Sequence, residues 1–340
     1  MKREYDFVFL RKKTSYSKHR YDTVVDKTNE EERELIDRCR SIADTFYETL
    51  QNNGYVNTNF KRCSLDTEGY FLSATKNGEK ETLLGIVEHG GKIKRGGYSS
   101  QHMYLNMTAI KSLIASNNID KVAIIIFHEL LNLEETTLEK TTGARELGNA
   151  ESSGGRIFNK GLANVKALRL FQKAFNRQYL QKEQISSGFK TASQTDSLIT
   201  QVTGNLINVL GLDIDELIKD GINNKENHRA NIIEHFKNAG VSFIADISPP
   251  FEKMYELIYK SRKRDLTQLE KVELAGIINK IQNTTKGIYN QKHPNATKEE
   301  KAAFAQNFID TSKTYTQTKF LCELCGIEPE RANREQDKTI

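Results

Sequence analysis

The chain has 340 residues, of which 37% are hydrophobic and 28% are charged, so it contains enough apolar material for a folded core. Its 50 Lys and Arg residues against 45 Asp and Glu give a formal charge of +5, too mild to favour a nucleic acid as the main partner. The start, MKREYDFVFLRKK, lacks the apolar centre of a signal peptide, and no segment has the length and hydropathy of a membrane span. The sequence therefore predicts a cytoplasmic protein.

The first 115 residues combine strand and helix patterns. Short apolar or alternating segments at residues 7–10, 70–74, 83–88 and 103–107 are typical of strands. Apolar residues spaced by threes and fours predict an amphipathic helix over residues 30–51, and a second, shorter helix is expected over 108–115. This mixture predicts a small N-terminal sheet accompanied by helices.

A buried helix is predicted over residues 121–135. Its apolar content is nearly continuous from Val122 to Phe127, and Asn117, Asn118 and Asp120 supply the break and the cap before it. Polar residues follow that apolar run within the same helix. Polar groups in so apolar a helix need partners, which makes them candidates for a functional site.

After this helix the pattern changes to a connection rich in Gly, Ser, Thr and Glu over residues 136–158. Helical periodicity resumes at Lys160, and nearly everything beyond Gln184 is expected to be helical. The sequence therefore predicts two domains, an α+β domain over residues 1–184 and a helical C-terminal domain over 185–340. Helices of the second domain are expected over residues 196–210, 214–220, 229–238, 251–260, 266–288 and 298–325.

The segment IIIFHELLN, residues 124–132, carries the most specific motif. A helix with His-Glu-x-x-His places two imidazoles one turn apart, where they bind zinc, with the Glu as general base. Here His128 and Glu129 match this pattern, while Asn132 stands where the second His is required.

The order of a strand, a buried HELLN helix, a Gly-rich connection and a helix that opens with Asn-Lys-Gly resembles the zincin metallopeptidases, specifically the gluzincin branch. The resemblance covers about residues 98–179 and implies a zincin-like α+β fold. It also implies that His128 corresponds to the first zinc ligand and Glu129 to the general base. Asn159 corresponds to the Asn of the Asn-Glu motif, and Lys160 to its Glu, the third ligand.

Two of the three ligands that the resemblance implies are thus replaced. The carboxamide of Asn132 is a weak zinc ligand, and the ammonium of Lys160 has no free lone pair and repels a dication. We therefore expect no cofactor. An ion pair between Lys160 and Glu129 in the place of the metal is a hypothesis that follows from the same substitutions.

The sequence leaves three functions open. The first is a zincin-like pseudoenzyme that has lost zinc and peptidase activity and binds a protein or peptide partner. The second is a metal-dependent peptidase with zinc held by His128 and rearranged ligands from loop carboxylates such as Glu146 and Glu151, with Glu129 as catalytic base. The third is a helical interaction protein unrelated to the zincins.

Other candidate sites have simpler explanations. His228 and His235 lie in a charged helix, where solvent exposure or helix capping is the expected role. The acids in GLDIDELIKD, residues 211–220, suit a helix start better than a calcium loop. The single C-x-x-C of Cys322 and Cys325 predicts two reduced thiols.

Overall fold

The computed structural model describes most of the chain, in segments separated by gaps. The described segments are residues 6–10, 30–57, 68–72, 85–88, 102–135, 137–139, 143–145, 153–177, 192–261 and 264–301.

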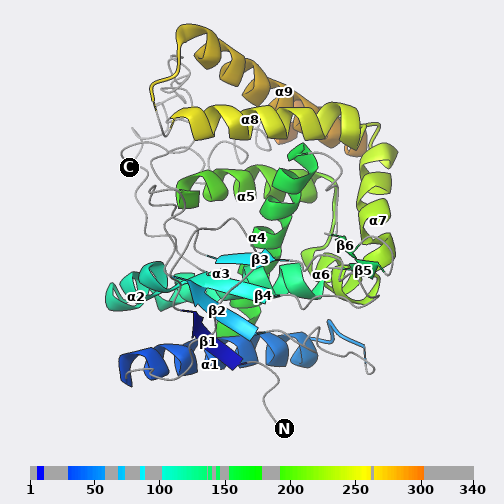
Figure 1. Cartoon of the computed structure of the whole chain (residues 1–340). Coiled ribbons are helices and arrows are strands. Elements are labelled where there is room, and N and C mark those ends of the chain that lie inside the picture. The colour runs from blue at the N-terminus through cyan, green and yellow to red at the C-terminus, as the bar shows by residue number, and fades with distance from the viewer. Residues whose placement is uncertain are drawn as a thin grey trace, which may run out of the picture. The chain divides into compact units, whose positions relative to one another are not determined.

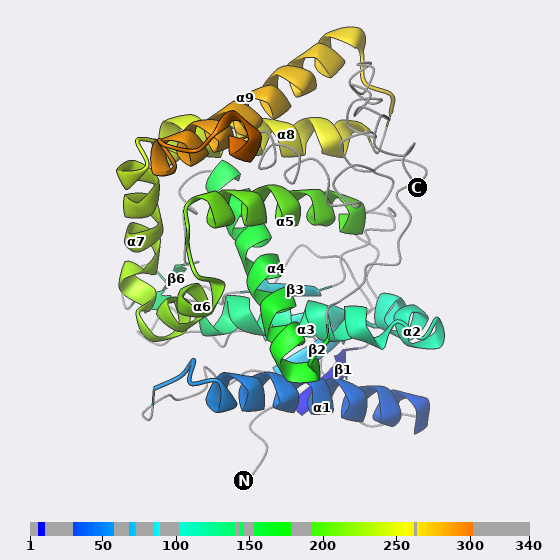
Figure 2. The same cartoon turned by 180° about the vertical axis from the view of Figure 1, so that it is seen from behind.

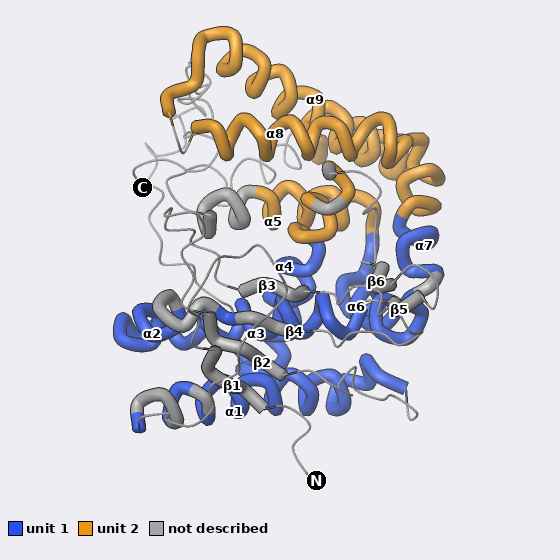
Figure 3. Tube along the Cα trace, in the orientation of Figure 1, with its two compact units in different colours: residues 1–150, 162–181, 212–232 blue, residues 151–161, 182–211, 233–340 orange. Residues whose placement is uncertain are grey.

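Two compact units make up the chain (Figure 3). Unit 1 comprises Met1–Ala150, Leu162–Gln181 and Leu212–Ile232, and unit 2 comprises Glu151–Gly161, Lys182–Gly211 and Ile233–Ile340. Two long helices, α4 and α7, each contribute residues to both units. Compact units of a folded chain need not be the units that fold independently, so the predicted domain division at residue 184 stays a prediction.

Helices dominate both units, as Figures 1 and 2 show from opposite sides. The helices are α1 (Glu30–Asn52), α2 (Met107–Ala115), α3 (Ile119–Glu134), α4 (Ser153–Phe175), α5 (Ala192–Val209), α6 (Ile214–Asn223), α7 (Lys225–Asn238), α8 (Ser248–Ser261) and α9 (Gln268–Lys292), with a short π-helical turn η1 (Phe243–Ile247). The short strands are β1 (Asp6–Leu10), β2 (Glu68–Leu72), β3 (Gly85–Glu88), β4 (His102–Asn106), β5 (Thr137–Glu139) and β6 (Gly143–Arg145).

The strand segments are a minor component of three to five residues each. They are ordered β1-β2-β4-β3, with β2 parallel to β1 and β4, and β3 antiparallel to β4; β5 and β6 form a separate antiparallel pair. In register, Tyr70 lies opposite Val8 and Tyr104, and Ile86 lies opposite Tyr104.

The predicted α+β class with a small N-terminal sheet is wrong. Helices make up most of the residues that the structure describes, so the fold is mostly helical. The physical reason lies in the core, because its described side chains come almost entirely from amphipathic helices that bury their apolar faces against one another. Among the described core residues of unit 1, only Leu105 comes from a strand.

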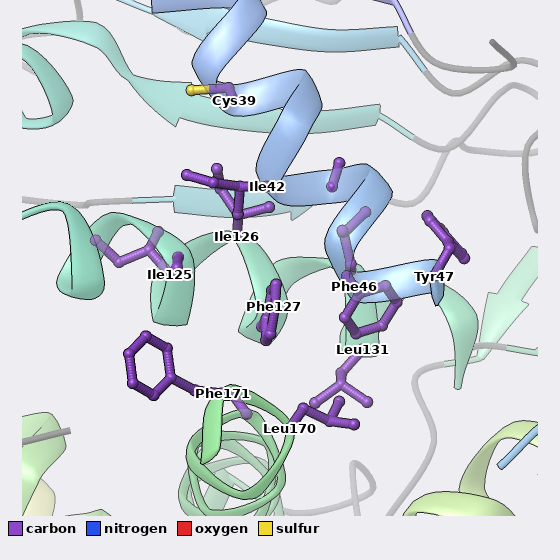
Figure 4. Close-up of a cluster of buried hydrophobic side chains, with 14 of the residues drawn as sticks. Cys39, Ile42, Phe46, Tyr47, Ile125, Ile126, Phe127, Leu131, Leu170 and Phe171 are labelled. Carbon is purple, nitrogen blue, oxygen red and sulfur yellow. The ribbon is translucent and has the colours of Figure 1, made fainter. Parts of the chain in front are cut away.

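The core of unit 1 is built on α1, whose apolar residues recur at helical spacing and are buried along one face. Phe46 of α1 packs edge-on against Phe127 of α3, with ring centroids 5.4 Å apart. Figure 4 shows side chains of α1, α3 and α4 meeting in this core. Its labelled members are Cys39, Ile42, Phe46, Tyr47, Ile125, Ile126, Phe127, Leu131, Leu170 and Phe171.

A polar contact lies within this core. The Tyr47 hydroxyl donates a hydrogen bond of 2.6 Å to Glu134 Oε1, and both side chains are buried.

Burial also raises the pKa of the Cys39 thiol to about 12, so this cysteine stays protonated at neutral pH.

The core of unit 2 centres on Phe158 in the first half of α4. Its ring makes edge contacts with Phe236, Phe243 and Phe251, with centroid distances of 5.8, 5.1 and 5.7 Å. All four side chains are at most 2% exposed. Edge-to-face packing of this kind suits the quadrupoles of aromatic rings.

The start of α4 lies close to the start of α8. A Cβ atom built on Gly154 would lie 1.8 Å from the backbone oxygen of Ser248, so no larger residue fits here without moving the backbone. The sequence placed Gly154 in a connection that ends at residue 158, whereas α4 already begins at Ser153. The glycine permits close packing of two segments and does not break the helix.

The other predicted helices agree with the structure within a few residues where the structure describes them. The acid-rich start of α6 is confirmed as a helix start, because the Asp213 side chain accepts a hydrogen bond from the backbone N–H of Asp215. Pro249 and Pro250 lie in the first turn of α8, where a missing N–H costs little. The predicted helix over residues 298–325, including Cys322 and Cys325, lies largely outside the described residues.

Candidate functional site

The residues of the HELLN motif lie on α3, as predicted. Glu129 is buried, His128 and Asn132 are half-buried, and these last two lie one turn apart on the same side of the helix. Asn159 and Lys160 are half-buried on α4, in unit 2, whereas the HELLN residues belong to unit 1. The ion pair between Lys160 and Glu129 therefore stays a prediction.

Zinc binding at this motif can be measured directly. Among the residues that the structure describes, no group of three or more His, Cys, Asp and Glu is placed to hold a metal ion. The coordination argument against Asn132 and Lys160 as ligands gives the expectation that protein purified without added metal contains far less than one zinc per chain. Stoichiometric zinc in elemental analysis that is lost in His128→Ala, but kept in the control His235→Ala, would contradict it.

A buried cluster of charged residues lies elsewhere in unit 1, and we call it the Lys166 cluster. It consists of Glu135 at the end of α3, Lys166 of α4, Asp220 of α6 and His228 of α7. Lys166 has no exposed surface, and its Nζ lies 2.7 Å from Glu135 Oε1 and 3.0 Å from His228 Nε2. The other ring nitrogen of His228, Nδ1, lies 2.8 Å from Asp220 Oδ2.

With Lys166 as an ammonium, these contacts assign the ring proton of His228. An ammonium group only donates hydrogen bonds, so His228 Nε2 must accept from Lys166. The ring proton is then on Nδ1, which donates to Asp220 Oδ2. His228 is therefore neutral, and the cluster is a continuous chain of hydrogen bonds from one carboxylate through an ammonium and an imidazole to a second carboxylate.

The surroundings shift the pKa values of two of these groups, His228 and Asp220. Burial, and next the nearby Lys166 ammonium, lower the pKa of His228, against the opposing influence of Glu135 and Asp220. The pKa of Asp220 is also lowered: burial acts to raise it, but hydrogen bonds from His228, Asn224 and Asn231 prevail. Both directions favour the charge distribution inferred from the hydrogen bonds.

Space for the cluster depends on a glycine of α6. A Cβ atom on Gly221 would lie 2.5 Å from Glu135 Oε1 and 3.0 Å from Lys166 Nζ. A larger residue at this position would displace the ion pair. Because the Lys166 side chain is fully enclosed, its amine is not placed to contact a substrate, and the arrangement acts on the helices that it joins.

Sequence reasoning missed this cluster. His228 was expected to be exposed or to cap a helix, and this is wrong because its ring is inserted between α4 and α6 and is only 2% exposed. The expectation for His235 is confirmed, since that side chain is exposed. One signal was present: Lys166 lies on the same helical face as the buried Leu162 and Leu170, four residues away on either side.

A second polar cluster in unit 1 surrounds Asp215 of α6. Arg169 of α4 binds its carboxylate with two hydrogen bonds of 2.7 Å, and the Tyr55 hydroxyl donates a third of 2.9 Å. Lys173 lies 3.4 Å away. The Arg169 hydrogen bonds, and then that of Tyr55, outweigh partial burial and lower the pKa of Asp215 to about 2. This cluster joins α4, α6 and the segment after α1.

In unit 2, α8 and α9 form a helical hairpin (Figure 1). Two ion pairs cross between the helices, Lys253 to Glu273 at 3.5 Å and Lys260 to Glu270 at 3.8 Å. These pairs define the register of the hairpin and place the end of α8 beside the start of α9.

A capping box fixes the start of α9. The Thr267 side chain accepts a hydrogen bond from the Glu270 backbone N–H, and the Glu270 side chain accepts one from the Thr267 backbone N–H. Arg264 also binds Glu270 with two hydrogen bonds of 2.7 and 2.8 Å. The hydrogen bonds from Arg264, and next the hydrogen bond from the Thr267 backbone, lower the pKa of Glu270 to about 2. Several contacts to the Glu270 carboxylate thus hold the first turn of α9.

Large apolar side chains are exposed at this end of the hairpin. Of the described large hydrophobic residues that are exposed, three lie here: Leu269 at 80%, Val272 at 58% and Tyr259 at 37%. The fourth, Ile244 of η1, is 67% exposed. We call Tyr259, Leu269 and Val272 the hairpin tip. Single exposed apolar residues are common on folded proteins. Here Leu269 and Val272 lie three residues apart at the start of α9, and Tyr259 lies near the end of α8.

No helix in the described part of the chain has the length and apolar character needed to cross a membrane. No family model matches the sequence, and no solved structure matches the fold.

Proposed function

We propose that this protein is a non-catalytic helical protein that acts by binding a protein partner through the hairpin tip. The observation that supports this proposal is the exposure of Leu269 and Val272 on successive turns of α9, together with that of Tyr259 near the end of α8. The proposal retains the binding role expected from the sequence. It does not depend on the resemblance to the gluzincins.

Energetics favour a partner that covers these side chains. Burying a side chain such as Leu or Val contributes about 1.5–3 kcal/mol relative to leaving it in water. The capping box already fixes the first turn of α9, which carries Leu269, so little additional ordering of that turn is needed on binding. A rigid platform with two apolar side chains one turn apart suits the apolar face of another helix.

The charge of the surrounding sequence indicates the partner's chemistry. Residues 260–271 contain five basic and two acidic residues, and the carboxylate of Glu270 is held by Arg264 and the capping box. An acidic segment would therefore be attracted to this end of the hairpin. We infer that the partner presents an amphipathic helix with acidic and apolar residues.

The test is a peptide-display selection against the purified full-length protein, followed by fluorescence anisotropy with the selected peptides. We expect acidic peptides with apolar residues at helical spacing. Their binding should weaken about tenfold or more in Leu269→Asp/Val272→Asp, because two apolar contacts are lost and like charges are added. Both sites are exposed, so the variant should keep the thermal stability of the wild type.

The control is Ile244→Asp, which adds one negative charge, against two in the double variant, at another exposed apolar residue of unit 2. It should bind the selected peptides like the wild type. Equal weakening in both variants, or selected peptides without acidic residues, would contradict the proposal. A third outcome would also contradict it: no selected peptide needs Leu269 and Val272 for binding, but phosphatidylserine vesicles do. The surface would then recognise a membrane.

A further inference from the structure

We propose that the Lys166 cluster is an acid-sensitive latch that holds the start of α7 against α4 and α6. The latch is the chain of contacts in which His228 of α7 joins Lys166 of α4 to Asp220 of α6. It lies within unit 1 and is independent of the proposed binding at the hairpin tip.

The mechanism follows from the hydrogen-bond roles. In the neutral ring, His228 Nε2 is the atom that accepts the hydrogen bond from Lys166. When Nε2 takes up a proton from solvent, it becomes a donor and can no longer accept. Two positively charged N–H donors then face each other across 3.0 Å, where Lys166 has no exposed surface and His228 is only 2% exposed. The hydrogen bond is lost and replaced by repulsion, so the two side chains must separate.

The charged groups around His228 come from three other helices. Glu135 from the end of α3 and Asp220 from α6 favour the protonated ring, whereas Lys166 from α4 opposes it. Asp220 is already bound through Nδ1–H in the neutral ring, so protonation creates no new hydrogen bond with it. Glu135 is already paired with Lys166 at 2.7 Å. The Lys166 contact is therefore the one that protonation breaks.

The segment expected to move is the first part of α7. Lys166 lies in the middle of the 23-residue helix α4, with buried apolar neighbours on both sides. His228 lies in the first turn of α7, directly after the short link at Asn224 that ends α6. Local opening of a helix end costs less than displacement of a central helix, so α7 should release first.

The direction of the pH dependence follows from the lowered pKa of His228. The unfolded or opened ring, with its ordinary pKa near 6.5, binds a proton at a pH where the closed ring does not. The stabilisation is therefore fully present above about pH 6.5 and decreases as the pH falls below that value. The equilibrium constant for opening should rise by up to about tenfold per pH unit, the limit for one proton.

Hydrogen exchange measured by mass spectrometry on the full chain between pH 7.5 and 5 tests the latch. After correction for the intrinsic pH dependence of exchange, the amides of α7 after His228 should lose protection below pH 6.5 in the wild type. In His228→Gln, which does not titrate, this dependence should disappear. His235→Gln, an exposed histidine seven residues further on the same helix, should behave like the wild type.

Nitrogen chemical shifts of the His228 ring in the wild type provide a second measurement that does not depend on a variant that folds. At pH 7.5 they should show a neutral ring with the proton on Nδ1. A flat α7 profile in the wild type, the same slope in His228→Gln, or a ring that is protonated or carries its proton on Nε2 at pH 7.5 would each overturn the proposal.

Discussion

Replacing Phe158 by Ala is expected to lower the free energy of unfolding by about 3–5 kcal/mol, the usual cost of removing a fully buried aromatic ring. The ring has no exposed surface and makes edge contacts with three other phenylalanines. Its loss would leave a cavity at the centre of unit 2, because helices on all sides are fixed by their own packing. Urea unfolding followed by circular dichroism measures the effect.

The matched control is Phe158→Leu, which keeps most of the apolar volume and should cost about 1–1.5 kcal/mol. A second control is Tyr259→Ala, which removes a ring that is 37% exposed in the same unit and should have a much smaller effect. If Phe158→Ala were as stable as the wild type within about 1 kcal/mol, the ring would not lie in the core of a folded unit.

The helices of this fold were largely predictable because their apolar residues recur at a period near 3.6. α1, predicted over residues 30–51, spans Glu30–Asn52, and α3, predicted over 121–135, spans Ile119–Glu134. In both helices the residues that create the pattern are also those that fill the core. For these two helices, the local sequence period and the burial in the folded protein therefore both indicate a helix with the same apolar face.

The start of α4 was not predictable in this way. Gly154 and Gly155 have low helix propensity and follow a polar segment, so local signals favour a connection. The reason for a glycine at residue 154 is the Ser248 backbone, which lies more than ninety residues later in the chain. No pattern within the segment itself contains that information.

The fold class failed for a related reason. Short alternating segments such as those at 7–10 and 70–74 satisfy the strand pattern, but the pattern does not reveal whether strands supply the core. The resemblance to the gluzincins then weighted these segments as the sheet of a zincin-like domain. The described core of unit 1 is formed mainly by helices, with Leu105 as its one member from a strand.

The polar site was only partly accessible from sequence. A Lys between two buried leucines of α4 indicates a buried cation, but the other members of the Lys166 cluster come from three other helices at unrelated spacings. Glu135 lies 31 residues before Lys166, and His228 lies 62 residues after it. Contacts of this kind follow from the packing of helices and have no local sequence pattern.

Lys166→Met is expected to lower the free energy of unfolding by about 3 kcal/mol, the lower end of the range for removing one partner of a buried ion pair. Met fills a similar volume, so the loss comes from the charges that stay behind rather than from a cavity. Glu135 would lose its cation, and His228 Nε2 would lose its donor. The lower end applies because the Glu135 side chain keeps 13% exposure and some contact with water.

A second substitution separates charge from packing. In Lys166→Met/Glu135→Gln the uncompensated carboxylate is gone, so part of the lost stability should return. The matched control is Lys173→Met, which removes a half-exposed lysine two turns further along α4 and should cost less than about 1 kcal/mol. Equal losses for Lys166→Met and Lys173→Met would show that Lys166 is solvated in the folded protein. A buried ammonium depends on protein partners that replace its water, so removing a truly buried Lys166 must cost more than removing Lys173. Without that difference, the Lys166 cluster would be no more than a surface ion pair.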